Sequence, residues 1–440
     1  MFGFGNRKTE NTPPLDAGRV APFMVAYAPD LTARDPSLLG ELQRAAAERP
    51  VQLLNAATLL AQPPRSAEFL VALMLDPTQL DVLADATVAA RNGGLNTTLV
   101  VCVAYDQLTM LGQWLNRRAA DGGLSGVRLI LAADAESALE QLPERLMSPA
   151  GDNVIRMPKT TDVEESEFRN FFVFSPELHD LVGRVRAYAE NGVHRVYLLG
   201  GPGSGKTSLA YYYYLARKRG RFVTVNLAAE NTGDKAAVKS LLCGHVTGAF
   251  PGAGARTGAF QHARDGVCFI DESHGIAGPV MEVLMEAFDN GQYLPLGASA
   301  KQRLESAIVF ATNRSWQHLQ DSVNIDEFTR LGAATLKVPE LSGREEDMIA
   351  VVATSLSALS ARCTTWSPPK GVTHDAWRAI RGCRWHGNIR ALIRVMESAF
   401  VEAAIQSDVP LLQADQITQG IELWEPRSHH SHQLYAVNMN

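Results

Sequence analysis

Val196-Tyr197-Leu198-Leu199-Gly200-Gly201-Pro202-Gly203-Ser204-Gly205-Lys206-Thr207-Ser208 is the stretch that decides the fold of this chain. Its four leading apolar residues predict a buried strand, and residues 200–207 match G-x-x-x-x-G-K-[S/T], a loop between a strand and a helix. Glycines let backbone N–H groups point at phosphate oxygens, and the N-terminus of the helix adds a partial positive charge. The segment from Gly200 to Ser208 therefore predicts a site for ATP and Mg²⁺, in which Lys206 contacts the β- and γ-phosphates and Thr207 binds the metal ion.

Two further strands are predicted to end in polar residues beside this loop. The apolar residues 267–270 lead into Asp271-Glu272, and residues 307–311 lead into Thr312-Asn313. At the end of a strand, Asp271 is placed to hold Mg²⁺ and Glu272 to orient and deprotonate the attacking water. Asn313 has two interpretations: a γ-phosphate sensor on a strand between the other two, or the start of a turn.

The composition indicates a chain with two or three packed domains. It has 440 residues, of which 46% are hydrophobic and 20% charged, and its net charge of −6 shows no global basic excess for nucleic-acid binding. The five cysteines have no metal-ligand or disulfide spacing. No apolar run approaches the ~20 residues of a membrane helix, and the N-terminus lacks the apolar part of a signal peptide. We expect a cytoplasmic protein without a membrane segment.

The spacing of apolar runs predicts two α/β units and a helical region. Strands are predicted at residues 23–27, 51–54, 69–75, 99–103 and 127–131, with amphipathic helices at 38–48, 80–91 and 108–118. Such alternation is typical of a parallel sheet with helices on both faces, as in flavodoxin-like and receiver domains. We divide the chain into a disordered N-terminus (1–21), a receiver-like α/β regulatory domain (22–148), a linker (149–170), a second α/β subdomain (171–338), a helical region (339–425) and a disordered tail (426–440).

Residues 242–253, Leu-Cys-Gly-His-Val-Thr-Gly-Ala-Phe-Pro-Gly-Ala, resemble the signature of bacterial enhancer-binding proteins. These are the sigma-54-dependent transcription activators of the AAA+ class. Residues 221–226, 258–272, 311–314 and 385–390 (Trp-His-Gly-Asn-Ile-Arg) resemble further motifs of the family, so the resemblance covers about residues 171–421. It implies an AAA+ core, with a P-loop α/β subdomain at 171–338 and a helical lid at 339–425.

The resemblance also implies a mechanism and site residues. Subunits form a ring, usually hexameric, with ATP between neighbours. Asn226 restrains the catalytic Glu272 until remodelling, and Arg390 contacts nucleotide from the lid. Arg330 aligns with a trans-acting arginine finger, the other interpretation being a surface cation, while the family's preceding arginine falls on Asn324. The loop at residues 248–253 pushes on the sigma-54 RNA polymerase.

Two departures from the family pattern bear on function. Pro251 stands where the family has a threonine that engages the sigma factor, and proline removes both an N–H and the hydroxyl. Helical patterning ends near Trp424, and residues 426–440 are too few for a DNA-reading helix pair. We therefore expect no autonomous sequence-specific DNA-binding domain, and Pro251 either abolishes or alters the sigma-54 contact.

The N-terminal domain lacks part of a receiver's phosphorylation chemistry. Asp76 follows the third predicted strand and Asp30 the first, but no lysine follows Leu131 and no threonine or serine follows Val103. Without a lysine, a phosphorylated aspartate lacks its cationic partner. A working receiver remains one interpretation; we favour a receiver-like domain that senses another signal or serves in docking.

These observations lead to one functional hypothesis with two alternatives. The chain is predicted to be an ATP-hydrolysing AAA+ regulator of transcription that uses ATP turnover in a ring to remodel sigma-54 RNA polymerase. The first alternative is a degenerate ATP-binding member of the family that modulates a partner activator. The second is an AAA+ remodelling ATPase unrelated to transcription.

Overall fold

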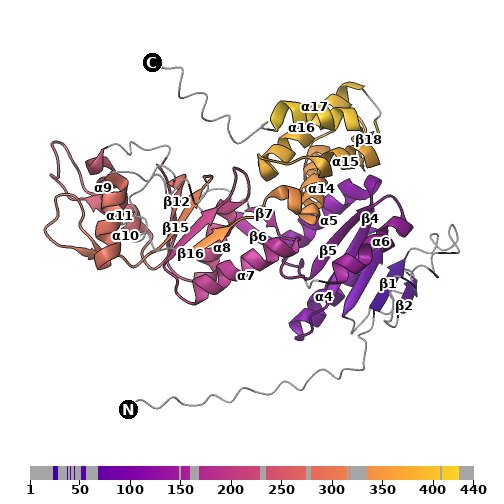
Figure 1. Ribbon diagram of the computed structural model, residues 1–440, viewed down its shortest axis with the longest axis horizontal. Coiled ribbons are helices and arrows are strands. Elements are labelled where there is room, and N and C mark those ends of the chain that lie inside the picture. The colour runs from indigo at the N-terminus through magenta and orange to yellow at the C-terminus, as the bar shows by residue number, and fades with distance from the viewer. Residues whose placement is uncertain are drawn as a thin grey trace, which may run out of the picture.

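The computed structural model describes residues 23–27, 51–55, 68–147, 150–158, 168–227, 234–273, 279–314, 334–406 and 409–425, with residues 37, 40, 44 and 317 singly. The predicted disordered termini lie outside these ranges and stay predictions. Asp30, Asn324 and Arg330 also lie outside the described residues. Figure 1 shows the N-terminal domain in indigo and purple, the second α/β subdomain in magenta and salmon, and the helical lid in orange and yellow.

The N-terminal domain is built on a five-stranded parallel sheet. Its strands are β1 (Phe23–Tyr27), β2 (Val51–Asn55), β3 (Phe69–Leu73), β4 (Thr98–Ala104) and β5 (Val127–Ala132). They run in the order β2-β1-β3-β4-β5. This is the strand order of flavodoxin-like and receiver domains, so the predicted fold of this domain is confirmed.

Helices cover both faces of that sheet. On one face α4 (Pro77–Asn92) and α5 (Leu108–Ala120) pack Leu83 and Leu111 against Val101. On the other face α6 (Ala135–Leu146) packs Leu139 against Cys102. Strand β4 is apolar at nearly every position because both of its faces are buried, which is the pattern expected of a central parallel strand.

The second α/β subdomain contains another five-stranded parallel sheet, in the order β16-β8-β15-β12-β9. Its strands are β8 (Arg195–Leu199), β9 (Phe222–Asn226), β12 (Val267–Asp271), β15 (Ala307–Thr312) and β16 (Ala334–Lys337). Strand β15 lies between β8 and β12, as predicted. Its helices are α7 (Pro176–Glu190), α8 (Lys206–Arg217), α9 (Lys235–Cys243), α10 (Ala259–His262) and α11 (Pro279–Asn290). The parallel arrangement brings the carboxyl ends of these strands to one edge.

Short strand pairs and a helical lid complete the second half of the chain. The pairs are β10 (Gly244–His245) with β11 (Arg256–Thr257), and β13 (Gln292–Tyr293) with β14 (Gln302–Arg303). The lid contains the 3-10 turn η4 (Leu341–Gly343), the helices α14 (Glu345–Ala361), α15 (His374–Gly382), α16 (Asn388–Gln406) and α17 (Ala414–Trp424), and the paired strands β17 (Gly371–Val372) and β18 (Leu411–Leu412). Among the described helices, none is long and apolar enough to cross a membrane.

The segment predicted to be a linker, residues 149–170, differs from that expectation. Strand β6 (Val154–Pro158) pairs antiparallel with β7 (Phe168–Phe172), so much of its described part is regular structure. Ile155 and Met157 alternate with more exposed residues and are buried against the core of the second subdomain. Two buried apolar positions are enough to fix a short strand, but they are too few to stand out in a polar stretch.

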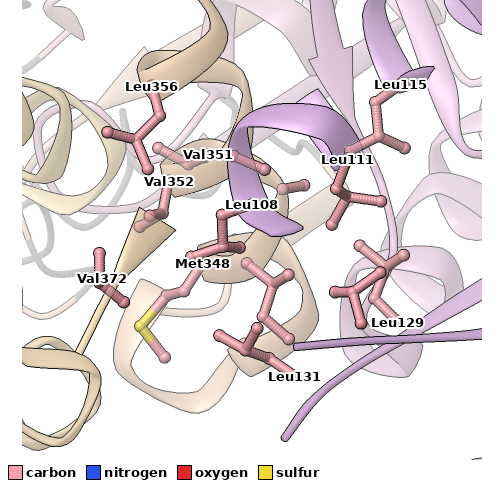
Figure 2. Close-up of a cluster of buried hydrophobic side chains, with 14 of the residues drawn as sticks. Leu108, Leu111, Leu115, Leu129, Leu131, Met348, Val351, Val352, Leu356 and Val372 are labelled. Atoms are coloured by element: carbon pink, nitrogen blue, oxygen red, sulfur yellow. The ribbon is translucent and has the colours of Figure 1, made fainter. Parts of the chain in front are cut away.

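Helix α14 belongs to the lid, yet it completes the hydrophobic core of the N-terminal domain. Residues 348–353 of α14 are apolar and all buried, which means that the helix is covered on every side. Figure 2 shows α14 residues such as Met348 and Val352 facing Leu108 and Leu111 of α5 and Leu131 of β5. The two helices approach so closely that a Cβ on Gly112 would lie 2.0 Å from the Ala353 carbonyl oxygen. The N-terminal domain and the lid therefore share one core.

A buried ion pair crosses the same interface. Arg128 of β5 donates from Nη2 to Oε1 of Glu346 at 2.6 Å and from Nε to Oε2 at 2.9 Å, with side-chain exposures of only 2% and 3%. The Leu129 amide donates to the same carboxylate at 3.0 Å. Burial raises the pKa of Glu346, although Arg128 and Arg145 act to lower it. A bidentate pair of this kind is geometrically specific, so it fixes how α14 sits on β5.

Replacing Glu346→Gln is expected to lower the free energy of unfolding by about 3–5 kcal/mol, because it leaves the Arg128 guanidinium buried without a counter-charge. Equilibrium denaturation with urea measures the effect. The control Glu397→Gln removes an exposed lid partner of Arg394 and should cost under about 1 kcal/mol. The double variant Arg128→Met, Glu346→Leu should recover much of the loss. Equal, small effects of Glu346→Gln and Glu397→Gln would contradict this account.

Candidate active site

The loop between β8 and α8 presents polar groups that are available to bind an anion. The buried Ser204 hydroxyl has no hydrogen-bond partner in the described part of the chain. Lys206 folds back and donates from Nζ to the carbonyl oxygens of Gly200 at 2.8 Å and Gly201 at 2.9 Å. Helix α8 begins directly at Lys206, so its free N–H groups open into the same space. An anion would meet both the ammonium group and the helix N-terminus here.

Lys206 is also close to the acids predicted for the neighbouring strand. Loss of solvent lowers the pKa of Lys206, Asp271 and Glu272 act to raise it, and Arg390 of the lid acts to lower it. The lysine, both acids and the lid arginine therefore lie within electrostatic reach of one another. These residues belong to separate motifs that lie up to 184 positions apart in the sequence. The fold brings them together at one edge of the sheet.

Strand β12 ends at Asp271, and the next residue has an unusual backbone. Glu272 has a φ of +53°, in the left-handed region that a residue with a side chain rarely adopts. Its amide donates to Oδ1 of Asp271 at 2.9 Å. Positive φ at a non-glycine residue stores strain and clusters at functional sites. The turn directs the chain sharply away from the strand immediately after Asp271.

The two asparagines predicted for the site lie on the strands that flank β12. Asn226 is the last residue of β9 and pairs in register with Asp271. Asn313 directly follows β15, whose Thr312 carbonyl accepts from the Gly200 amide at 3.2 Å. The Asn313 Oδ1 atom is buried and has no donor among the described residues. Both side chains therefore sit at the same edge as Asp271 and the phosphate loop.

The lid meets the phosphate loop through the segment 385–390. A Cβ on Gly203 would lie 2.5 Å from the Gly387 carbonyl oxygen and 2.8 Å from Cβ of Arg390, so this contact requires glycine. Asn388, which is 2% exposed, donates to the Pro202 carbonyl at 3.2 Å and accepts from the Leu341 amide at 3.0 Å. Asn388 thus ties the phosphate loop to the start of the lid, a role that the motif did not reveal.

A carboxylate at the far end of the lid holds this segment in place. Glu425, which follows α17, accepts hydrogen bonds from the amides of His386 and Gly387. Trp385 and Asn388 have φ values of +50° and +49°, so the segment is kept in a strained shape. Glu425 lies 35 residues after Arg390 and carries no motif, which explains why sequence reasoning missed it.

The loop at residues 246–253 projects from β10 on the same subdomain. The Gly248 amide donates to the Ala253 carbonyl at 3.0 Å, and the Ala253 amide donates to the Phe250 carbonyl at 3.0 Å. Phe250 is 47% exposed, and its ring centroid lies 5.1 Å from that of His245. The backbone of the loop is therefore closed by its own hydrogen bonds, while its aromatic side chain stays accessible.

The carboxyl edge of the N-terminal sheet uses its acids as helix caps. Asp76 accepts from the amides of Thr78 and Gln79 and caps α4. Asp134 caps α6, and hydrogen bonds from Ser137 lower its pKa. Strand β3 ends at the fully buried Leu73. Within the described ranges, no three His, Cys, Asp or Glu side chains gather as a metal site, at this edge or elsewhere.

Comparison with known proteins places the second subdomain. The model of the Sigma-54 interaction domain matches residues 172–337. The nitric oxide reductase transcription regulator NorR1 of Cupriavidus necator is 32% identical over 54% of this chain and 47% of its own length. The DNA-binding transcriptional regulator NtrC of Azospirillum brasilense is 31% identical over 49% of this chain and 45% of its own.

Two further likenesses extend over more of the chain. The alginate biosynthesis transcriptional regulatory protein AlgB of Pseudomonas putida is 28% identical over 79% of this chain and 75% of its own length. A crystal structure of NtrX from Brucella abortus in complex with ADP covers 95% of this chain and 89% of its own, with a TM-score of 0.48 and 17% identity. The chain spans about half the length of the first curated relatives that it matches. Residues 172–337, which contain the phosphate loop and the paired acids, therefore match the Sigma-54 interaction domain, and the relatives with which they align are transcriptional regulators.

Proposed function

We propose that this chain is an ATP-hydrolysing AAA+ regulator of transcription, which turns over ATP in a ring of its own copies to remodel sigma-54 RNA polymerase. The observation that carries the proposal is the convergence of Lys206, Asp271, Glu272 and Arg390 on one edge of a parallel sheet. This edge is where α/β sheets bind ligands. The family's ring is usually a hexamer, and we extend that assembly to this chain.

The residues present fit ATP and Mg²⁺. The Ser204 hydroxyl, which has no partner among the described residues, and the glycines of the loop fit a phosphate group, and Lys206 would leave its carbonyl partners for the β- and γ-phosphates. Mg²⁺ prefers one or two protein oxygens together with phosphate oxygens and water, so the hydroxyl of Thr207 and the carboxylate of Asp271 suffice. The bound metal ion would neutralise charge on the transferred phosphoryl group.

Glu272 acts in this proposal as the general base. Its strained backbone separates it from Asp271, so that one carboxylate serves the metal ion and the other the attacking water. Asn226, in register with Asp271, restrains Glu272. The free Oδ1 atom of Asn313 would accept a hydrogen bond from the attacking water, and its NH2 group would donate to the γ-phosphate. Arg390 contacts nucleotide from the lid. Arg330 of a neighbouring subunit would stabilise charge in the transition state, a prediction that lies outside the described residues.

The loop at residues 246–253 is the proposed contact with the sigma factor, and its backbone accommodates Pro251. Pro251 is the second residue of a turn closed by Ala253 and Phe250, and Gly252, the third, has a φ of +79°. Proline second and glycine third are the residues that a type II turn favours. Because the hydrogen bond of this turn does not use the amide of its second residue, proline removes the family's hydroxyl and leaves the turn intact. We infer that Pro251 alters the contact and that Phe250 carries it.

The N-terminal domain is proposed to control the ATPase through the lid. Its capping use of Asp76 and Asp134 supports a signal other than aspartate phosphorylation. Its shared core with α14 supplies a direct route to the lid segment that contacts Gly203. A ligand or partner that shifts this domain would shift the position of Arg390.

Glu272→Gln is expected to lower the rate of ATP hydrolysis by ~10²-fold or more, because an amide cannot take the proton of the attacking water. Nucleotide affinity should stay within about threefold of the parent chain. Phosphate release and binding of a fluorescent ATP analogue measure the two quantities. Glu190→Gln, an exposed change on α7, is the matched control and should hydrolyse ATP normally. Unchanged hydrolysis by Glu272→Gln would refute the assigned base.

Phe250→Ala is expected to abolish the complex that the full chain forms with sigma-54 in the presence of ADP and aluminium fluoride, because it removes the exposed aromatic group of the loop. Pro251→Thr should bind at least as strongly as the parent chain. Native gels and analytical ultracentrifugation measure complex formation, and ATP hydrolysis serves as the control for folding. A complete lack of complex, even for Pro251→Thr, would favour a remodelling ATPase unrelated to transcription.

A further inference from the structure

A buried arginine at the end of α8 has no counter-charge among the residues that the structure describes. Arg217 is 8% exposed, and in the described part of the chain its Nε, Nη1 and Nη2 atoms have no hydrogen-bond partner. Its guanidinium carbon lies 6.0 Å from the centre of the Tyr213 ring. The Tyr213 hydroxyl donates to the Val193 carbonyl. Guanidinium groups are almost always hydrogen-bonded when buried, since desolvation of the charge is costly.

The position of Arg217 explains part of this arrangement. A cation in the last turn of a helix is favoured by the helix dipole, and the face of an aromatic ring attracts a guanidinium group. Neither interaction gives Nε, Nη1 or Nη2 an acceptor of good geometry among the described residues, although the guanidinium group is close enough to the Tyr213 hydroxyl to act on its pKa. The arrangement is that of an arginine ready to accept an oxyanion, for which its planar fork of donors is suited.

Further cations follow directly along the chain. Residues 217–221 read Arg-Lys-Arg-Gly-Arg, and Lys218, Arg219 and Arg221 are exposed. Within the described ranges, none of the three has a carboxylate at ion-pairing distance; the nearby Asp265 lies 4.0 Å from Arg264 instead. A run of basic residues this dense is a pattern of polyanion-binding segments.

Arg217 and Arg219 also converge on one histidine. Partial loss of solvent lowers the pKa of His194, and Arg217, Arg219 and Arg195 lower it further. The same two arginines act on the Tyr213 hydroxyl. Tyr213 links these residues in space, since its ring lies 6.0 Å from the guanidinium carbon of Arg217 and its hydroxyl bonds the residue before His194. Arg219 follows two residues after Arg217, just beyond the end of α8. We call His194, Arg217 and Arg219 the basic site.

The basic site is separate from the nucleotide site. The phosphate loop precedes α8, whereas Arg217 is the last residue of this 12-residue helix, so the two ends lie about 16–18 Å apart. His194 directly precedes β8, at the amino edge of the sheet, while Asp271 and Asn226 lie at the carboxyl edge. A ligand in one site therefore cannot be a ligand of the other. Figure 1 shows α8 lying across the sheet with its neighbour α7.

We propose that the basic site binds a phosphate group, with Arg217 and Arg219 as its guanidinium ligands. Arginine pairs with phosphate through two parallel N–H···O bonds, so two arginines can bind the oxygens of one phosphate group or of two adjacent phosphodiesters. Lys218 and Arg221 extend the positive charge beyond the reach of a single phosphate. This extension favours the phosphates of a nucleic-acid backbone over free phosphate as the source.

Fluorescence anisotropy with labelled duplex DNA tests the proposal on the full chain saturated with ADP. The parent chain should bind with an affinity that falls steeply with salt. Arg219→Gln should weaken binding about five- to tenfold at low salt and reduce the salt slope by about 0.9, the value for one lost phosphate contact. Arg184→Gln, an exposed arginine of α7 paired with Asp180, is the matched control and should bind as the parent does. Equal affinities and slopes for Arg219→Gln and the parent would overturn the nucleic-acid source.

A second arm uses inorganic phosphate and the His194 ring proton resonance. A bound dianion should raise the pKa of His194, and Arg219→Gln should remove that response; phosphate at the nucleotide site cannot cause it at this distance. A response without DNA binding assigns free phosphate as the source, and a response with DNA binding assigns the backbone. No response and no DNA binding would overturn the proposal. Because Arg219 is exposed, its variant leaves folding intact, which thermal unfolding verifies, whereas Arg217→Gln serves only as a confirming change.

Discussion

Two neighbouring carboxylates at the start of α14 join the three parts of this chain. Glu346 binds Arg128 of the N-terminal sheet. Asp347 accepts from the Phe174 amide at 2.8 Å, from the Ser175 hydroxyl, and from Nε of Arg344 at 2.9 Å, where the chain leads into α7. Both acids are about 98% buried or more, so neither can exchange its partners for water. The geometry of the first turn of α14 therefore sets the relative positions of the N-terminal domain, the ATPase subdomain and the lid.

Because of this junction, the lid packs against both the N-terminal domain and the second α/β subdomain. The apolar side chains of α14 pack against the N-terminal domain, and the backbones are so close at Ala353 that position 112 must be glycine. The lid also contacts the phosphate loop through hydrogen bonds, because Asn388 donates to the Pro202 carbonyl and accepts from the Leu341 amide. Coupling between sites needs a contiguous network of packed and hydrogen-bonded groups with more than one arrangement. Packed and hydrogen-bonded groups run here from β5 through α14 and η4 to the phosphate loop.

Sequence reasoning recovered the parts of the site that are encoded locally. The loop at Lys206 and the strand ending in Asp271 each carry their chemistry within a few residues, and the alternation of apolar runs with helical patterns predicted the parallel α/β fold of the N-terminal domain. The pair of Arg128 and Glu346 spans 218 positions and has no local signature, since a buried charge looks like a surface charge in the sequence. Glu425 was not predicted for the same reason, since its partners lie far away in the sequence and no motif marks it. The strand at residues 154–158 was missed because only two of its side chains are fully buried.

The N-terminal domain meets the lid at the carboxyl edge of its sheet. Its acids cap helices, so charge at this edge is already committed to local structure. The segment after β4 packs closely against the lid. A Cβ on Gly371 of β17 would lie 1.7 Å from the Tyr105 carbonyl oxygen, and the Thr109 amide donates to the Lys370 carbonyl at 2.9 Å. The turn after β4 therefore contacts the lid directly. The backbone at Tyr105 and strand β17 of the lid are therefore packed too closely for a side chain at position 371.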